Sequence, residues 1–90
     1  MKVVINKCFG GFGLSKKAYK FLNIPWDGYG YEFMEDRSNP ALVKCVEALG
    51  KDASGELSSL NVVEIPDDVT WEIAEYDGLE SVVEKHHKWG

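Results

Sequence analysis

Short apolar runs along the chain predict several strands. Val3-Val4-Ile5 is a buried run typical of a strand, and residues 60–65 form another that ends at Pro66. Residues 69–73 alternate apolar and polar side chains, which is the period of a strand with one buried face. Residues 31–34 predict a further short strand.

Capping signals predict a first helix after residue 14. Ser15 is a favoured N-cap residue, because its hydroxyl accepts a hydrogen bond from a backbone N–H of the first turn. Asn23 suits the left-handed terminator of the helix, and Pro25 prevents its continuation. The expected inward face consists of Ala18, Tyr19 and Leu22.

A second helix is predicted between Asn39 and Gly50. Asn39 is the expected N-cap, Pro40 occupies the first helical position, and Gly50 follows the last turn. Apolar residues repeat at helical spacing between them: Leu42, Val46 and Leu49, with Val43 and Cys45 beside them. The polar residues 51–59 then predict a loop.

The conformation of the last segment is open between a strand and a helix. Asp77-Gly78 favours a two-residue type I′ hairpin, which would pair Ile73 with Val82. The same hairpin would place Glu75 opposite Glu80, and like charges across strands destabilise a sheet. A helix capped by Asp77 is the alternative for residues 79–88, and the hairpin is preferred.

Together these elements predict one α+β domain over residues 1–90. A mostly antiparallel sheet of three to five strands would carry two helices on one face. Hydrophobic residues make up 44% of the chain, and three Trp, four Tyr and four Phe exclude the composition of a disordered chain.

Charge is distributed unevenly along the sequence. Residues 1–20 hold five lysines and no acid, whereas the remainder holds five basic and fifteen acidic residues. The net charge of −5 argues against direct nucleic-acid binding. No apolar run is long enough to span a membrane, and no secretory signal precedes Cys8 and Cys45, so we expect a soluble cytoplasmic protein with two free thiols.

Several stretches resemble small proteins of about this length that are encoded in phage and prophage genomes and have no assigned function. The resemblance covers residues 1–15 (MKVVINKCFGGFGLS), 39–43, 60–66, 71–78 and 83–89. It implies an accessory protein that acts in the cytoplasm of a bacterial host, and it transfers no catalytic residue.

The glycine-rich segment before the first helix is a candidate anion site. A strand, a glycine loop and a capped helix can direct backbone N–H groups toward a phosphate. The candidate ligand-binding residues are Gly10, Gly11, Gly13, Ser15, Lys16, Lys17 and Arg37. The segment matches neither the P-loop motif nor the dinucleotide-binding motif. A tight turn that requires glycine explains the segment equally well.

The aromatic residues after the first helix either cover the small core or form a second kind of site. Trp26, Tyr29 and Tyr31 lie in a turn-like segment and are candidate partner-binding residues, since Trp and Tyr are enriched at interface hot spots. Arg37 is the only arginine and could hold a carboxylate or phosphate with two parallel hydrogen bonds. A surface ion pair with Glu35 or Asp36 is the commoner arrangement.

Signals for catalysis are weak. Cys8 near a helix start could be a nucleophile with His86 or His87 as its base, but a small buried residue is the commoner role. Adjacent histidines diverge too much to hold one metal ion together, so no metal and no cofactor are expected. We therefore expect non-catalytic binding of a host protein, with a phosphate-bearing ligand such as a nucleotide as the alternative, a cysteine enzyme as a remote one, and homodimerisation possible.

Overall fold

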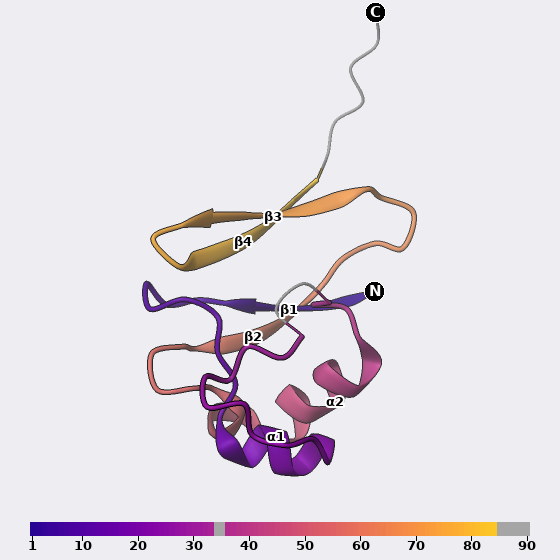
Figure 1. The fold of residues 1–90 in the computed structure, drawn as a ribbon. Helices are drawn as coiled ribbons and strands as arrows, with labels where there is room; N and C mark the ends of the chain where they lie inside the picture. Colours follow the sequence, from indigo (N-terminus) through magenta and orange to yellow (C-terminus); the bar gives the residue numbers. More distant parts are fainter. Residues whose placement is uncertain (34–35, 85–90) are drawn as a thin grey trace, which may run out of the picture.

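The computed structural model describes residues 1–33 and 36–84. Strands β1 (Lys2–Asn6) and β2 (Leu60–Glu64) form an antiparallel pair in the middle of the molecule. Helices α1 (Lys16–Leu22) and α2 (Pro40–Leu49) both lie on one face of this pair, as predicted (Figure 1). A 3₁₀ turn, η1 (Gly50–Ala53), follows α2 directly.

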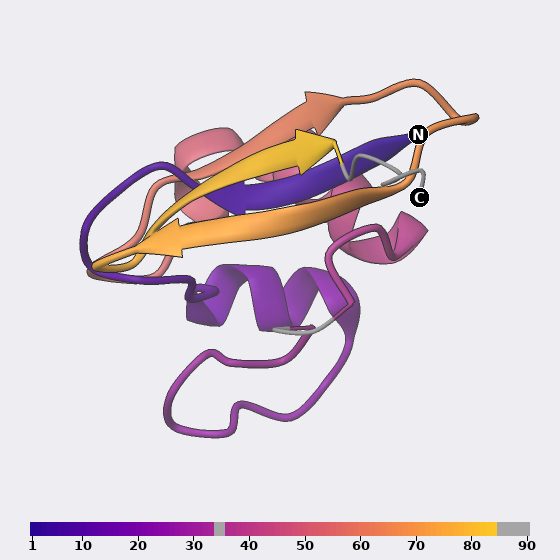
Figure 2. The same cartoon turned by 90° about the horizontal axis from the view of Figure 1, so that it is seen from above.

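A β-hairpin covers the other face of the central pair. Strands β3 (Trp71–Tyr76) and β4 (Leu79–Glu84) are antiparallel to each other, and β4 lies against β1. Figure 2, seen from the hairpin side, shows β3 and β4 lying over β1 and β2. The molecule therefore consists of a hairpin, a central strand pair and a helical layer.

The helix boundaries follow the capping signals. The Ser15 hydroxyl accepts a hydrogen bond from the N–H of Ala18, and Asn23 ends α1 in the left-handed conformation with φ 57°. The Asn39 side chain accepts from the N–H of Ala41 and of Leu42, and α2 begins at Pro40. Both predicted helices and all of their predicted caps are confirmed.

The main core lies between the helices and the central strands. It contains Val4, Phe12, Leu14, Ala18, Tyr19, Leu42, Val43, Cys45, Val46, Ala53 and Leu60. Alternation along β1 turns Val3 and Ile5 to the opposite face from Val4, and both are completely or almost completely buried. The β3–β4 hairpin covers that face of β1, which explains why Val3 and Ile5 are buried.

The Asp77-Gly78 hairpin is confirmed, and the helical alternative for residues 79–84 is wrong. Asp77 has φ 50° and Gly78 has φ 90°, the two positive values that a type I′ turn needs. The predicted opposition of Glu75 and Glu80 is also present. The two carboxylates are separately satisfied: Glu80 is bound by Arg37, and Glu75 accepts a hydrogen bond from the Gly78 N–H at 2.5 Å.

The prediction of a single sheet is corrected. The structure has four strands in two separate antiparallel pairs, β1–β2 and β3–β4. The edge of β1 that could pair with β4 is already occupied, because the N–H of Val4 donates to the carbonyl of Arg37 and the N–H of Asn6 donates to the Glu80 carboxylate, each at 2.8 Å. A side chain of β4 thus takes the place of its backbone at this edge.

Two further predictions are corrected. Residues 31–33 form no strand, because the backbone N–H groups of Tyr31 and Glu32 are bound by side chains instead of by a neighbouring strand. The predicted loop 51–59 begins inside η1, where Ala53 is fully buried in the core. Met34, Glu35 and the predictions about His86 and His87 lie outside the described residues. Within the described ranges, no helix combines the length and apolar character needed to cross a membrane.

Candidate functional site

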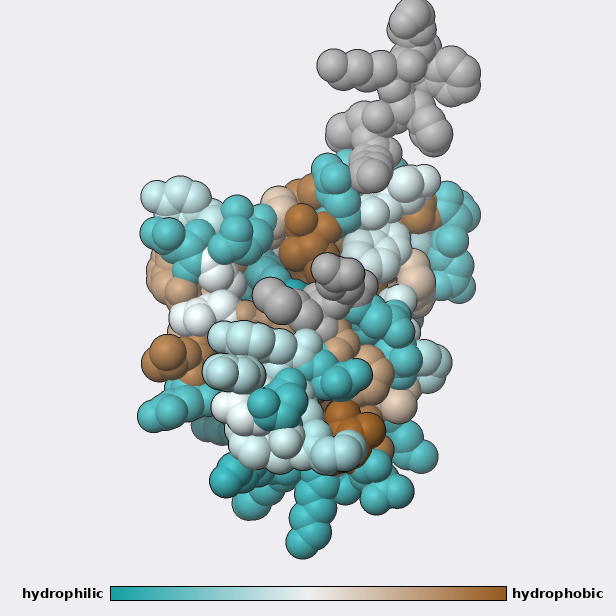
Figure 3. All heavy atoms as spheres, viewed as in Figure 1, coloured by the Kyte–Doolittle hydropathy of each residue, from teal (hydrophilic) through white to brown (hydrophobic). Residues whose placement is uncertain are grey.

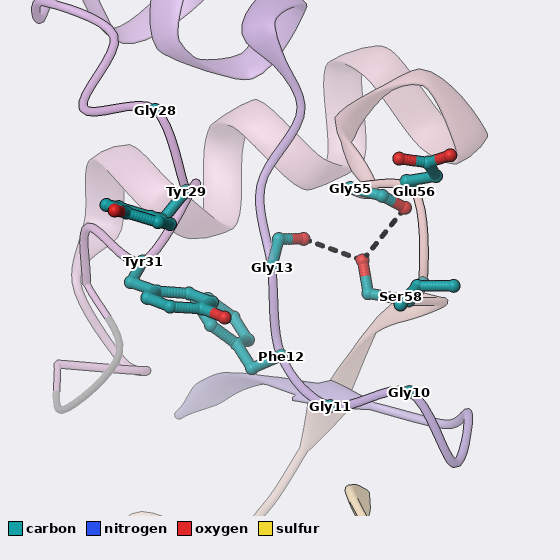
Figure 4. A pocket seen from close by; sticks show the side chains of 11 residues that line it. Gly10, Gly11, Phe12, Gly13, Gly28, Tyr29, Tyr31, Gly55, Glu56 and Ser58 are labelled. Atoms are coloured by element: carbon teal, nitrogen blue, oxygen red, sulfur yellow. Dashed lines mark hydrogen bonds between the residues drawn. The ribbon is translucent and has the colours of Figure 1, made fainter.

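A pocket of about 230 Å³ opens beside the glycine-rich segment (Figure 4). Three segments that are distant in sequence form it: residues 10–13, residues 28–31 and residues 55–58. Tyr29 and Tyr31 stand on one side, and Glu56 and Ser58 stand on the other. Five glycines also line the pocket, so much of its wall is backbone: Gly10, Gly11, Gly13, Gly28 and Gly55.

Close packing explains most of the glycine-rich loop. A Cβ at Gly10 would lie 1.8 Å from the Leu57 carbonyl oxygen, and one at Gly78 would lie 2.4 Å from the Gly11 nitrogen. Gly11 itself has φ 92°, which only glycine adopts without strain. The loop is therefore held between the 55–58 segment and the tip of the β3–β4 hairpin.

The two tyrosines of the pocket form an exposed stacked pair. Their ring centroids are 5.9 Å apart with an interplanar angle of 15°. Tyr29 is 74% exposed and Tyr31 54% exposed, and Leu57 on the opposite side is 70% exposed. The large side chains of Tyr29, Tyr31 and Leu57 thus stand around the pocket, and the described residues leave all three exposed.

Asp27 fixes the segment that carries the tyrosine pair. Its carboxylate accepts hydrogen bonds from the N–H groups of Tyr29 at 2.7 Å, Gly30 at 2.6 Å and Tyr31 at 3.3 Å. These bonds, with that from Gly30 the largest influence, lower the pKa of Asp27 to about 2. The carboxylate is therefore ionised at neutral pH and holds the turn by charge-assisted hydrogen bonds.

The hydroxyl of Tyr19 extends this network from the core. It donates to Asp27 Oδ2 and accepts from the N–H of Glu32, both at 2.8 Å. Burial raises the pKa of Tyr19 to about 12, so the hydroxyl keeps its proton over the physiological range. A core side chain of α1 and one carboxylate together fix residues 27–32.

The predicted ligand residues of α1 do not reach the pocket. Ser15 caps the helix and also donates to the carbonyl of Asp52. Lys17 forms an exposed ion pair with Asp52 at 3.6 Å, and the Nζ of Lys16 lies 5.9 Å from the Trp26 ring centre. Of the predicted ligand set, only the three glycines line this pocket.

Arg37 forms the bidentate carboxylate contact that the sequence suggested, with a partner that the sequence did not indicate. Its Nη1 and Nη2 donate to the two carboxylate oxygens of Glu80 at 2.5 and 2.8 Å. Both side chains are buried, and the guanidinium also lies 3.8 Å from the centre of the Phe12 ring. The observed pair with Glu80 of β4 is buried, and Glu35, one of the two surface partners that the sequence suggested, lies outside the described residues.

Trp26 belongs to a different surface from Tyr29 and Tyr31. It packs edge-on against Tyr19, with ring centroids 4.9 Å apart. It lines an open groove of about 620 Å³ along α1 together with Lys16 and Lys20. The structure thus divides the predicted aromatic cluster between two sites.

The two cysteines are the candidate nucleophiles of the chain. Cys8 is half-buried and Cys45 is buried, and both are free thiols. Burial raises the pKa of the Cys45 thiol. The histidines suggested as a base for Cys8 lie outside the described residues. No group of three or more His, Cys, Asp or Glu side chains within residues 1–33 and 36–84 is placed to hold a metal ion.

Sequence reasoning missed one entire side of the pocket. The sequence predicts only a polar loop for the segment that contains residues 55–58, and nothing in its composition indicates that Leu57 is exposed beside a glycine loop. Asp27 could have been found, since an aspartate followed by two glycines within three residues is a common side-chain-stabilised turn.

Comparison of the chain with models of protein families, with curated proteins and with solved structures gives no significant match. The geometry of the pocket is therefore the basis for assigning a function.

Proposed function

We propose that this protein is a non-catalytic binding module that holds a protein partner at the glycine-lined pocket. The part of the pocket that would contact the partner consists of Tyr29, Tyr31 and Leu57, and we refer to these three residues as the tyrosine surface. In line with the resemblance to small phage and prophage proteins, we further propose that the partner is a protein of the bacterial host.

The observation that supports this proposal most strongly is the hydrogen-bonded turn that carries an exposed aromatic pair. Asp27 and Tyr19 use five hydrogen bonds to fix residues 27–32, and the side chains displayed by that turn are Tyr29 and Tyr31. Ordering a binding loop before contact reduces the entropy lost on association. Tyrosine offers a large amphipathic contact area with few rotatable bonds.

The lining of the pocket suits a peptide more than a phosphate. Of its described lining residues the only charged one is Glu56, and none is basic. A phosphate would therefore meet a carboxylate and no cation. Glycine backbone and tyrosine hydroxyl groups instead provide neutral hydrogen-bonding positions beside the aromatic rings, and many aromatic with few charged residues is typical of the centre of a protein interface.

Affinity capture from host lysate with matched variants tests the proposal. Tyr29→Ser with Tyr31→Ser removes the stacked pair, whereas Tyr76→Ser removes a hairpin tyrosine whose exposure, 73%, is close to the 74% of Tyr29. The proposal predicts that a partner retained by the unmodified protein and by Tyr76→Ser is lost from the double variant. Equal retention by all three proteins would exclude the tyrosine surface as the binding site.

A further inference from the structure

The groove along α1 combines positive charge with an exposed indole. Its lining residues are Lys16, Tyr19, Lys20, Asn23, Ile24, Pro25 and Trp26. Trp26 is 40% exposed, and Lys16 and Lys20 are both exposed. In Figure 3 the lower end of the molecule, where α1 lies in this view, is mainly hydrophilic.

The two lysines of this groove have no acidic partner among residues 1–33 and 36–84. The ion pairs in that part of the chain involve other cations, and Lys17, between them in sequence, is paired with Asp52. Lys16 and Lys20 are four residues apart and therefore lie on the same side of the helix, where like charges repel. An anion bound between them would relieve this repulsion.

The nearest acid does not occupy the groove. Asp27 follows Trp26 directly, but both of its carboxylate oxygens accept hydrogen bonds from Tyr19 or from the N–H groups of residues 29–31. Those bonds direct the carboxylate of Asp27 toward residues 29–31 and stabilise its negative charge there. Lys16 instead lies over the Trp26 ring, a cation–π contact that is weak at an exposed site and that an ion pair with a bound anion can replace.

We propose that this groove binds a nucleoside phosphate, with the base stacked on Trp26 and the phosphates between Lys16 and Lys20. An indole supplies a π-face that accepts any base, and two ammonium groups at helical spacing can bind neighbouring phosphates as point charges. We assign a single nucleotide and not a strand, because Lys16 and Lys20 are the two basic residues that line the groove, whereas a nucleic-acid backbone is bound by a longer series of cations. This site is separate from the tyrosine surface and does not depend on the proposed function.

Isothermal titration of the whole protein with ADP, GDP, CDP and UDP tests this inference. At least one of them is expected to bind at least about tenfold more tightly than its nucleoside or inorganic pyrophosphate, because the site needs both ring and phosphate. Lys16→Ala with Lys20→Ala is expected to weaken that binding by about tenfold or more. The matched exposed pair Lys44→Ala with Lys51→Ala should leave it unchanged.

Several results would overturn the inference. Absence of binding for all four nucleotides would do so, and so would an unchanged affinity in the Lys16/Lys20 variant. Pyrophosphate binding as tightly as a nucleotide would also do so, because Trp26 would then have no role in binding. Tighter binding of a single-stranded oligonucleotide than of any nucleotide would reject the assignment to a small ligand. Alanine favours helix at exposed positions, so the lysine variant should fold, and circular dichroism checks that it does.

Discussion

The guanidinium of Arg37 and the carboxylate of Glu80 form a buried, two-bond ion pair that joins the β3–β4 hairpin to the rest of the molecule. Each side chain is no more than 7% exposed. Arg37 also donates to the Val4 carbonyl, and Glu80 accepts from the Asn6 N–H. These hydrogen bonds link the pair to backbone groups of β1. β4 is therefore held against β1 by side chains, without a backbone ladder between the two strands.

Breaking this pair on one side should destabilise the protein severely. Glu80→Met removes the carboxylate that both guanidinium nitrogens bind, and breaking one side of a buried ion pair typically costs about 3–5 kcal/mol. Arg37→Met removes the other charge, and the double variant Arg37→Met with Glu80→Met should be less destabilised than the sum of the two single variants by about 1–3 kcal/mol. Urea unfolding of the four proteins measures this coupling, and additive effects would show that the two residues do not depend on each other.

Substituting Gly78 should be more harmful than substituting Gly28. Both have nearly the same positive φ, 90° and 89°, so alanine carries a similar backbone penalty of about 1–2 kcal/mol at each. A Cβ at Gly28 meets open space, whereas one at Gly78 meets the backbone of Gly11. Thermal unfolding of Gly78→Ala should therefore show the larger loss, and equal losses would contradict the close contact between hairpin and loop.

Acid should release the turn that carries the tyrosine pair. The pKa of Asp27 is about 2 in the folded protein against an ordinary 3.8, so its stabilising contribution is complete above about 3.8 and is lost as the pH falls through about 2. The amide resonances of Tyr29, Gly30 and Tyr31 should shift together in that range and not in Asp27→Asn. A shared midpoint near 4 would mean that the carboxylate does not bind these groups.

Alkali should act on the same turn through Tyr19. Burial raises its pKa to about 12, so the stability that depends on the protonated hydroxyl is complete below about pH 10 and is lost as the pH rises through about 12. Tyr19→Phe removes one hydrogen-bond partner from Asp27 and one from the Glu32 N–H, at an expected cost of about 1–3 kcal/mol. Hydrogen exchange of residues 29–32 should accelerate in this variant, and unchanged protection would contradict the role of the hydroxyl.

Local signals in the sequence were sufficient for the helices and the hairpin. Ser15, Asn39 and Asp77-Gly78 each act within a few residues, through a cap or a turn, and each prediction was confirmed. The separation into two strand pairs could not be predicted, because it depends on Arg37 meeting Glu80 across 43 positions of sequence.

The candidate site was predictable only in part for the same reason. Gly10, Gly11 and Gly13 line the pocket as expected, but the cations of α1 point to other surfaces. The direction of Lys16 and Lys17 depends on where Trp26 and Asp52 lie in the fold. No pattern within α1 itself contains that information.

The most direct test of the tyrosine surface is photo-crosslinking inside bacterial cells. A benzophenone amino acid is placed at Tyr31, beside the pocket, or at Tyr76, on the hairpin, in otherwise identical proteins. The account predicts that a defined protein partner is crosslinked from position 31 and not from position 76. Crosslinking of the same partner from position 76 alone would contradict it.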